Sequence, residues 1–233
     1  MLKKHARTLL LPFFYLPLSC FAGHTIYSPH VEEGENEIEL TTDFIRDGDN
    51  HNEAYYLEFA KAVTSNWKAE LITVSETDNE NINRLTEVGI ENIVMLSEPG
   101  EYFLDFGALI ELIKSQQDDS PNEIEAGLLL QKDFSNWTWI TNLLVEKEVG
   151  NNAEGKIEAG LSMQAKLRLK PAYNPSIQLF SNEYETLIGP AIEGYTPINQ
   201  NKQKWGYSLA ALAGVTDASP KLTLRAKVEF EFY

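Results

Sequence analysis

The stretch that decides the fold is residues 156–170, which read KIEAGLSMQAKLRLK. The odd-numbered positions, from Ile157 to Leu169, are all apolar, and the even-numbered positions are polar or glycine. A β-strand points successive side chains to opposite faces, so this period of two gives one apolar face and one polar face. A helix would mix the two kinds of residue around its circumference. The stretch therefore predicts a long β-strand with two unlike faces.

The same alternation recurs along most of the chain. It is clean in residues 221–232, KLTLRAKVEFEF, and less regular in residues 102–112 and 205–215. Shorter candidates occupy residues 37–45, 53–64, 67–76, 84–95, 122–132, 137–149, 175–182 and 186–194. Together these segments predict about twelve strands, within a range of ten to fourteen.

The predicted connections alternate in length. Those at residues 47–50, 77–81 and 115–121 are acidic and rich in Asn, whereas those at 65–66, 97–100 and 135–136 are tight. Longer loops on one rim and short turns on the other are typical of an up-and-down barrel of the outer membrane. Residues 195–204 break this pattern, because they form a long connection where a short turn is expected.

Strand length favours a barrel over a soluble β-sandwich. A strand needs about 9 to 11 residues to cross a bilayer, whereas strands in globular proteins average about five or six. No window after the N-terminal region holds 18 consecutive apolar residues, which excludes a transmembrane helix. Aromatic residues near predicted strand ends suit the lipid interface; these are Tyr55, Trp67, Tyr102, Trp137, Trp139, Trp205, Tyr207, Phe230 and Phe232. We expect an all-β, antiparallel, up-and-down transmembrane barrel, with a soluble periplasmic sandwich as the alternative.

The N-terminus has the pattern of an export signal. Three bases, Lys3, Lys4 and Arg7, precede an apolar run over residues 8–21, and the small residues Cys20 and Ala22 suit cleavage before Gly23. Lipidation of Cys20 is the alternative, but Pro17 stands where a branched aliphatic residue is expected. We therefore predict a signal peptide at 1–22, an N-terminal periplasmic segment at 23–35 and a barrel domain at 36–233. Cleavage would remove the only cysteine, so no disulfide is expected.

Composition excludes some partners. The 233 residues include 19 Lys and Arg against 35 Asp and Glu, a formal net charge of −16. A nucleic-acid partner is not expected, because binding phosphates requires clustered Lys and Arg. The hydrophobic content of 43% is too high for a disordered acidic chain.

The charges predicted to face the barrel interior fall on two walls. The acids are Glu58, Asp105, Glu111, Glu123, Glu125 and Glu146, and the bases are Lys156, Lys166, Arg168, Lys221, Arg225 and Lys227. One interpretation is a polarised pore whose transverse field orients a small zwitterion or charged solute. The other is that these charges pair across a narrow lumen and fill it.

The histidines give little support for catalysis. A neutral-pH general base is usually His, but His24, His30 and His51 all lie outside the predicted strands, the first two on the expected periplasmic side. A Ser-His-Asp site would need His51 with Asp49 and a loop serine. The loop at 47–51 and the pair His24 and His30 are conceivable sites for a hard cation and for copper. We expect neither, and predict no metal, no cofactor and no enzymatic activity.

The last strand carries a resemblance to a known group. The export signal, the cysteine-free mature chain and the ending Glu229-Phe230-Glu231-Phe232-Tyr233 resemble small outer-membrane β-barrel proteins of Gram-negative bacteria. Residues 180–194, with Ile188-Gly189-Pro190, resemble uncharacterised or transporter-like barrels found near aromatic-degradation genes. In the first group the barrel-assembly machinery reads the final strand, although here the apolar stripe is one residue out of phase.

The resemblance implies a protein of the outer membrane, surrounded by its lipid. We expect a non-enzymatic passive pore for small solutes, whose identity the sequence does not give. A structural or adhesive barrel with a closed lumen and a soluble binding protein are the alternatives.

Overall fold

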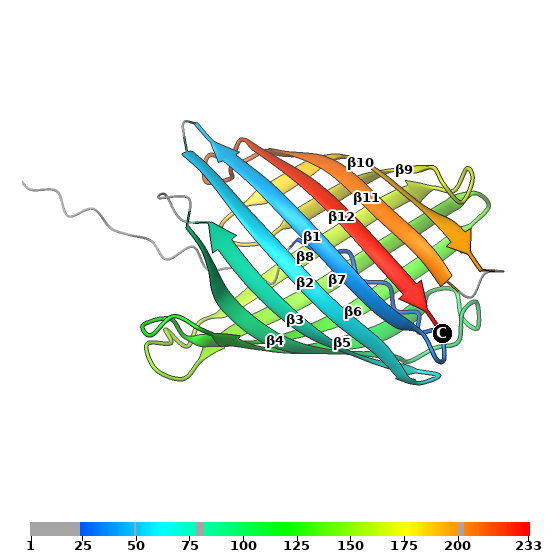
Figure 1. Ribbon diagram of the computed structural model, residues 1–233, viewed down its shortest axis with the longest axis horizontal. Coiled ribbons are helices and arrows are strands. Elements are labelled where there is room, and N and C mark those ends of the chain that lie inside the picture. Colours follow the sequence, from blue (N-terminus) through cyan, green and yellow to red (C-terminus); the bar gives the residue numbers. More distant parts are fainter. Residues whose placement is uncertain (1–23, 49, 78–81, 200–202) are drawn as a thin grey trace, which may run out of the picture.

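The computed structural model describes residues 24–233 except 49, 78–81 and 200–202. These residues form twelve strands that close into one barrel (Figure 1). The strands are β1 (Asn36–Asp47), β2 (Asn50–Thr64), β3 (Trp67–Thr77), β4 (Asn83–Met95), β5 (Asp105–Ser115), β6 (Asn122–Phe134), β7 (Trp137–Val149), β8 (Ile157–Leu167), β9 (Asn174–Ser181), β10 (Thr186–Ile198), β11 (Gln203–Gly214) and β12 (Leu222–Phe232).

Every strand pairs antiparallel with its neighbours in the sequence, and β1 pairs with β12. This up-and-down order confirms the predicted barrel, and the closure shows that the sandwich alternative was wrong. The described residues contain no helix that is long and apolar enough to span a membrane.

Three strand boundaries differ from the sequence prediction. β5 begins three residues late, at Asp105, because the Ser97 hydroxyl and the Leu96 N–H bond the backbone of Phe106 and hold residues 96–104 as a loop. β8 ends at Leu167, before a turn closed by the bond from the Tyr173 N–H to the Lys170 carbonyl. β10 runs on to Ile198 and β11 starts at Gln203, so the apparent long connection at 195–204 shrinks to residues 199–202. Consecutive strands therefore continue to run in opposite directions, joined by short connections, up to the C-terminus.

The faces of the barrel are inverted relative to a soluble protein. In β1, Glu39 and Asp43 are buried inside, whereas Ile38, Leu40 and Phe44 are exposed outside. Each of the twelve strands exposes at least one large apolar side chain in the same way. An exposed apolar surface of this extent is the mark of a face that meets lipid.

The two rims of the barrel can be told apart by the chain end. The C-terminal rim carries the start of β1, the end of β12 and the connections at 65–66, 96–104, 135–136, 168–173 and 199–202. The distal rim carries the connections at 48–49, 78–82, 116–121, 150–156, 182–185 and 215–221. The predicted long acidic loops lie on the distal rim, but the loop at 96–104 on the C-terminal rim is longer than any of them.

A glycine in β10 permits a close approach to β11. A Cβ atom on Gly189 would lie 1.9 Å from the carbonyl oxygen of Ala211 and 2.9 Å from the Cα of Leu212, so any side chain forces the two strands apart. We expect Gly189→Ala to destabilise the folded barrel by about 1–3 kcal/mol, the usual cost of overpacking. A lower temperature for the heat-induced mobility shift in detergent electrophoresis would measure this loss. Ala213→Val, on the exposed face of β11, is the control, and an equal effect of both substitutions would contradict the prediction.

Candidate functional site

The residues before β1 lie inside the barrel. We call residues 24–35 the inner segment; in chain order they run from the distal rim, where His24 lies, to the C-terminal rim, where β1 begins (Figure 1). Tyr27 and Val31 pack in one buried apolar cluster with Leu109 and Leu144 of the barrel wall, and Pro29 is fully buried. Residues 24–35, which belong to the expected N-terminal periplasmic segment at 23–35, therefore lie within the barrel, because their apolar side chains find partners on the inner faces of β4 to β7.

Polar side chains of the wall hold the backbone of the inner segment. The buried Asn142 of β7 accepts a hydrogen bond from the Tyr27 N–H at 2.9 Å and donates one to the Tyr27 carbonyl at 2.8 Å. The Ser28 hydroxyl donates to Gln131 at 3.0 Å, and the His30 ring lies 3.1 Å from the Asp105 carboxylate. These contacts satisfy backbone and side-chain groups that would otherwise be buried without partners.

Gly107 makes room for the segment to pass. A Cβ atom at this position of β5 would lie 3.1 Å from the Cβ of Pro29 and 3.0 Å from the carbonyl oxygen of Val94. The wall of the barrel is therefore shaped to the segment at this point.

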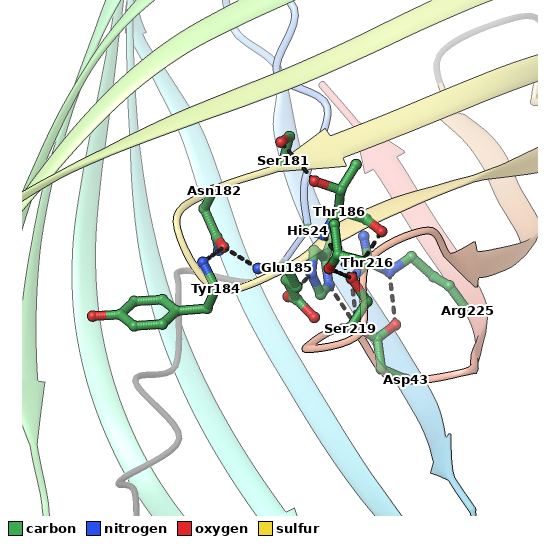
Figure 2. Close-up of polar contacts among 10 residues, drawn as sticks. All are labelled: His24, Asp43, Ser181, Asn182, Tyr184, Glu185, Thr186, Thr216, Ser219 and Arg225. Carbon is green, nitrogen blue, oxygen red and sulfur yellow. Dashed lines mark hydrogen bonds and ion pairs between the residues drawn. The ribbon is translucent and has the colours of Figure 1, made fainter.

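The distal end of the segment is anchored by ion pairs, which Figure 2 shows. The His24 ring lies 2.5 Å from the Glu185 carboxylate and 3.9 Å from that of Asp43, and Arg225 donates to Asp43 at 2.7 and 2.5 Å. Burial on its own would lower the pKa of the His24 imidazole, but the carboxylates of Asp43 and Glu185 outweigh it and raise that pKa above its usual value. The raised pKa favours the imidazolium form, which the two carboxylates bind.

The surrounding loops fix this anchor. The Asn182 side chain accepts the N–H groups of Tyr184 and Glu185, both at 2.8 Å, and so shapes the turn that presents Glu185 (Figure 2). The Ser219 hydroxyl accepts the Thr186 N–H at 2.9 Å and ties the β11–β12 loop to β10. These bonds make the distal anchor a rigid cluster.

No catalytic pair is formed by the histidines in the described residues. The ring of His24 bonds Glu185 and that of His30 bonds Asp105 and Gln131, and no serine hydroxyl bonds either ring. His51 is exposed at the start of β2, and Asp49 lies outside the described residues. The geometry therefore offers no nucleophile activated by an imidazole in this part of the chain.

The predicted interior charges divide into two groups. Nine occupy the inner face of a strand: Glu58, Asp105, Glu111, Glu123, Glu125, Glu146, Lys166, Arg225 and Lys227. Three lie at the rims instead: Lys156 precedes β8, Arg168 follows it and Lys221 precedes β12, and all three side chains are exposed. These three residues lie beyond the ends of β8 and β12, which are shorter than the alternation suggested, and Arg168 also lines a cavity near the C-terminal rim.

Interior bases pair with acids that the sequence reasoning did not single out. Lys227 lies 2.7 Å from Glu39, Lys68 lies 3.5 Å from both Glu37 and Glu70, and Lys166 lies 3.1 Å from Glu193. The sequence could have indicated these residues, since each lies at a polar position of an alternating strand and therefore on its inner face.

The interior of the described barrel holds cavities of different size. One, of about 410 Å³, opens near the C-terminal rim between β8 and β10 to β12, and its lining includes Lys166, Lys227, Glu193 and Glu229. Another, of about 20 Å³, lies beside Tyr27 on the opposite wall. The cavity at the C-terminal rim therefore presents both basic and acidic side chains to a solute.

The described residues bring one group of potential metal ligands together, Glu37, Glu39 and Glu229. Lys227 and Lys68 already neutralise this group at 2.7 to 3.5 Å. His24 and His30 bond different carboxylates and share no site. Part of the loop at 47–51 lies outside the described residues.

Comparison with known proteins identifies the architecture. No protein-family model and no curated protein matches the chain. Among solved structures, the NanC porin aligns with a TM-score of 0.58 and 8% identity over 84% of this chain and 99% of its own. The COG4313 outer membrane channel from Pseudomonas putida F1 aligns at 0.59 and 9%, over 87% and 96%, and the KdgM porin at 0.52 and 9%, over 84% and 98%. The chain thus has the fold of a small outer-membrane β-barrel protein.

Proposed function

We propose that the protein is a passive channel of the outer membrane for small solutes. The observation that carries the proposal is the inversion of the faces, an apolar belt outside all twelve strands around a charged interior. A wall of this kind suits lipid on one side and water on the other. The similar folds of a porin and an outer membrane channel support it.

The interior charges suggest which solutes would pass. The inner face of β4 to β8 is acidic, whereas Lys166, Arg225 and Lys227 lie on β8 and β12. The electric field between the acidic wall and the basic wall orients small zwitterions and attracts cations to the acidic wall. One KdgM porin structure holds a disordered oligogalacturonate, a polyanion; the acidic wall here would repel such a ligand. We propose zwitterionic, cationic or neutral small solutes instead.

The remaining parts of the proposal concern biogenesis and chemistry. We propose export by the signal at 1–22, and we infer insertion by the barrel-assembly machinery and contact with outer-membrane lipid from the resemblance of the last strand. We propose that the protein is not an enzyme, because His24 and His30 bond carboxylates rather than a nucleophile.

The inner segment favours a second candidate. Because it fills part of the bore and is anchored at both ends, the barrel could instead be a closed structural or adhesive protein. The two candidates differ in whether solutes cross the barrel once the segment leaves.

The proposal is tested by cell fractionation followed by reconstitution. We expect the protein in the outer-membrane fraction, a mobility shift on boiling in detergent, and ion conductance after insertion into planar bilayers. Reversal potentials in a KCl gradient should show preference for K⁺ over Cl⁻, because the unpaired interior charge is acidic. A soluble periplasmic protein without a heat shift would refute the proposal.

A further inference from the structure

A row of buried glutamates crosses the inner wall of the barrel. Adjacent members are directly opposite each other in the strand register, from Glu70 through to Glu158. We call this row the glutamate ladder, and it takes one residue from each of β3 to β8: Glu70, Glu91, Glu111, Glu125, Glu146 and Glu158. All six are buried. Like charges placed directly opposite each other destabilise a sheet, so such a row needs compensation.

Among the described residues, salt bridges reach the ladder at its two ends. Lys68 lies 3.5 Å from Glu70 at one end. At the other end, Tyr184 donates to Glu158 at 2.5 Å and Lys156 lies 3.8 Å from it. Within the described residues, no salt bridge reaches the middle of the ladder, Glu91 to Glu146.

Several oxygens in the middle of the ladder have no hydrogen-bond partner in the described part of the chain. Both carboxylate oxygens of Glu125 are in this state, as is one oxygen each of Glu111 and Glu146. Glu125 is 0% exposed and Glu111 2% exposed. A buried carboxylate without a partner carries a large desolvation cost, which a bound cation would remove.

A cavity of ionic size adjoins the ladder. The space of about 20 Å³ is bordered by Glu58, Glu87 and Glu111, with Tyr27 of the inner segment beside it. That volume holds one water molecule or one ion. Gly89, on the neighbouring strand β4, leaves room for the Glu111 carboxylate, because a Cβ atom on Gly89 would lie 3.3 Å from it. The unpartnered carboxylate of Glu111 thus borders a space that a cation can occupy.

We propose that the middle of the ladder binds divalent hard cations such as Ca²⁺ at Glu111, between its carboxylate and the facing carboxylate of Glu125. A divalent ion neutralises two facing carboxylates at once, and oxygen ligands are those that Ca²⁺ takes in proteins. The tighter cluster of Glu37, Glu39 and Glu229 is not the site, because Lys227 and Lys68 already supply its positive charge. The proposal goes beyond passage of solutes, since a cation can bind the ladder whether or not the barrel conducts.

The test is calcium binding by the full-length, folded protein in detergent. After EDTA treatment, titration calorimetry with CaCl₂ at neutral pH is expected to show saturable binding at or below about 1 mM. The double variant Glu111→Gln with Glu125→Gln should bind at least about tenfold more weakly, because it removes two charged ligands. The matched control is Glu98→Gln with Glu154→Gln, since it removes the same two charges from exposed loop positions.

A second readout separates loss of the site from loss of the fold. CaCl₂ should raise the temperature of the mobility shift for the wild type, and the double variant should resist heat better than calcium-free wild type while gaining little from CaCl₂. Absence of saturable binding, binding unchanged in the double variant, or stabilisation by acid alone and not by CaCl₂ would each overturn the proposal. None of these measurements involves a membrane, so a failed conductance experiment would bear on the channel proposal alone.

Discussion

Removing the inner segment from the barrel is expected to raise the single-channel conductance several-fold. In this variant residues 24–31 are deleted, so that Gly23 precedes Glu32 and the predicted cleavage site is kept. The physical reason is occupancy: Tyr27, Pro29 and Val31 are buried against the inner wall and take up space that ions would otherwise use. Conductance steps in planar bilayers, recorded at the same KCl concentration for both proteins, measure the effect.

A point variant provides an independent route to the same result. Asn142→Ala removes both hydrogen bonds to the Tyr27 backbone and leaves the segment in the chain. We expect conductance that switches between a low level and a level close to that of the deletion, because the segment is then less firmly held. The control is Thr141→Ala, because Thr141 is the neighbouring residue of β7 and lies on the opposite, outer face of the strand. Equal conductance in wild type, deletion and Asn142→Ala, each with a normal heat shift, would favour the closed structural barrel.

The strands were predictable because a transmembrane strand has to show its pattern locally. Lipid outside and polar groups inside impose a period of two that each strand displays by itself, as residues 157–167 do. Errors arose where that pattern continues past the last ladder bond, as at Arg168, or where β10 and β11 continue with less regular residues. A strand ends where its pairing with the neighbouring strand ends. That point depends on the neighbouring strand and cannot be deduced from the alternation of the strand itself.

The inner segment was missed because its partners are scattered over the wall. Residues 24–35 have no period, and their contacts are with Asn142, Gln131 and Asp105, each on a different strand. A signal did exist in residues 137–149, where Ile140 and Leu144 make the inner face apolar although the outer face is apolar too. A strand with two apolar faces in a polar-lined barrel predicts an apolar occupant of the lumen.

The glutamate ladder illustrates the same limit. Glu111, Glu125 and Glu146 were each assigned to the interior from parity, but parity does not give the register between strands. Only the register places them directly opposite one another, so that the three carboxylates lie next to each other and repel.

Breaking the buried ion pair between Asp43 and Arg225 is expected to cost about 3–5 kcal/mol of barrel stability, because removing one partner leaves the other charge uncompensated. Asp43 is 0% exposed, and Arg225 binds both of its carboxylate oxygens, at 2.7 and 2.5 Å. In Arg225→Met, the remaining cation near Asp43 is His24, at 3.9 Å, too far for a strong pair. The midpoint of urea unfolding, or the temperature of the mobility shift, measures the loss.

The design of the controls decides whether charge or packing is responsible. Glu183→Gln breaks an exposed pair with Lys156 and should change stability little, because solvent screens that interaction. The double variant Asp43→Leu with Arg225→Met should recover most of the stability, since no unpaired charge is then buried. It should not recover the hold on the inner segment, because His24 loses the Asp43 carboxylate in the double variant. If the double variant is stable yet conducts like the deletion, Asp43 has two separate roles, one in the wall of the barrel and one in the anchor of the segment. If the double variant is instead as unstable as Arg225→Met, packing at this position, and not the pairing of charges, sets the contribution of Asp43 to stability.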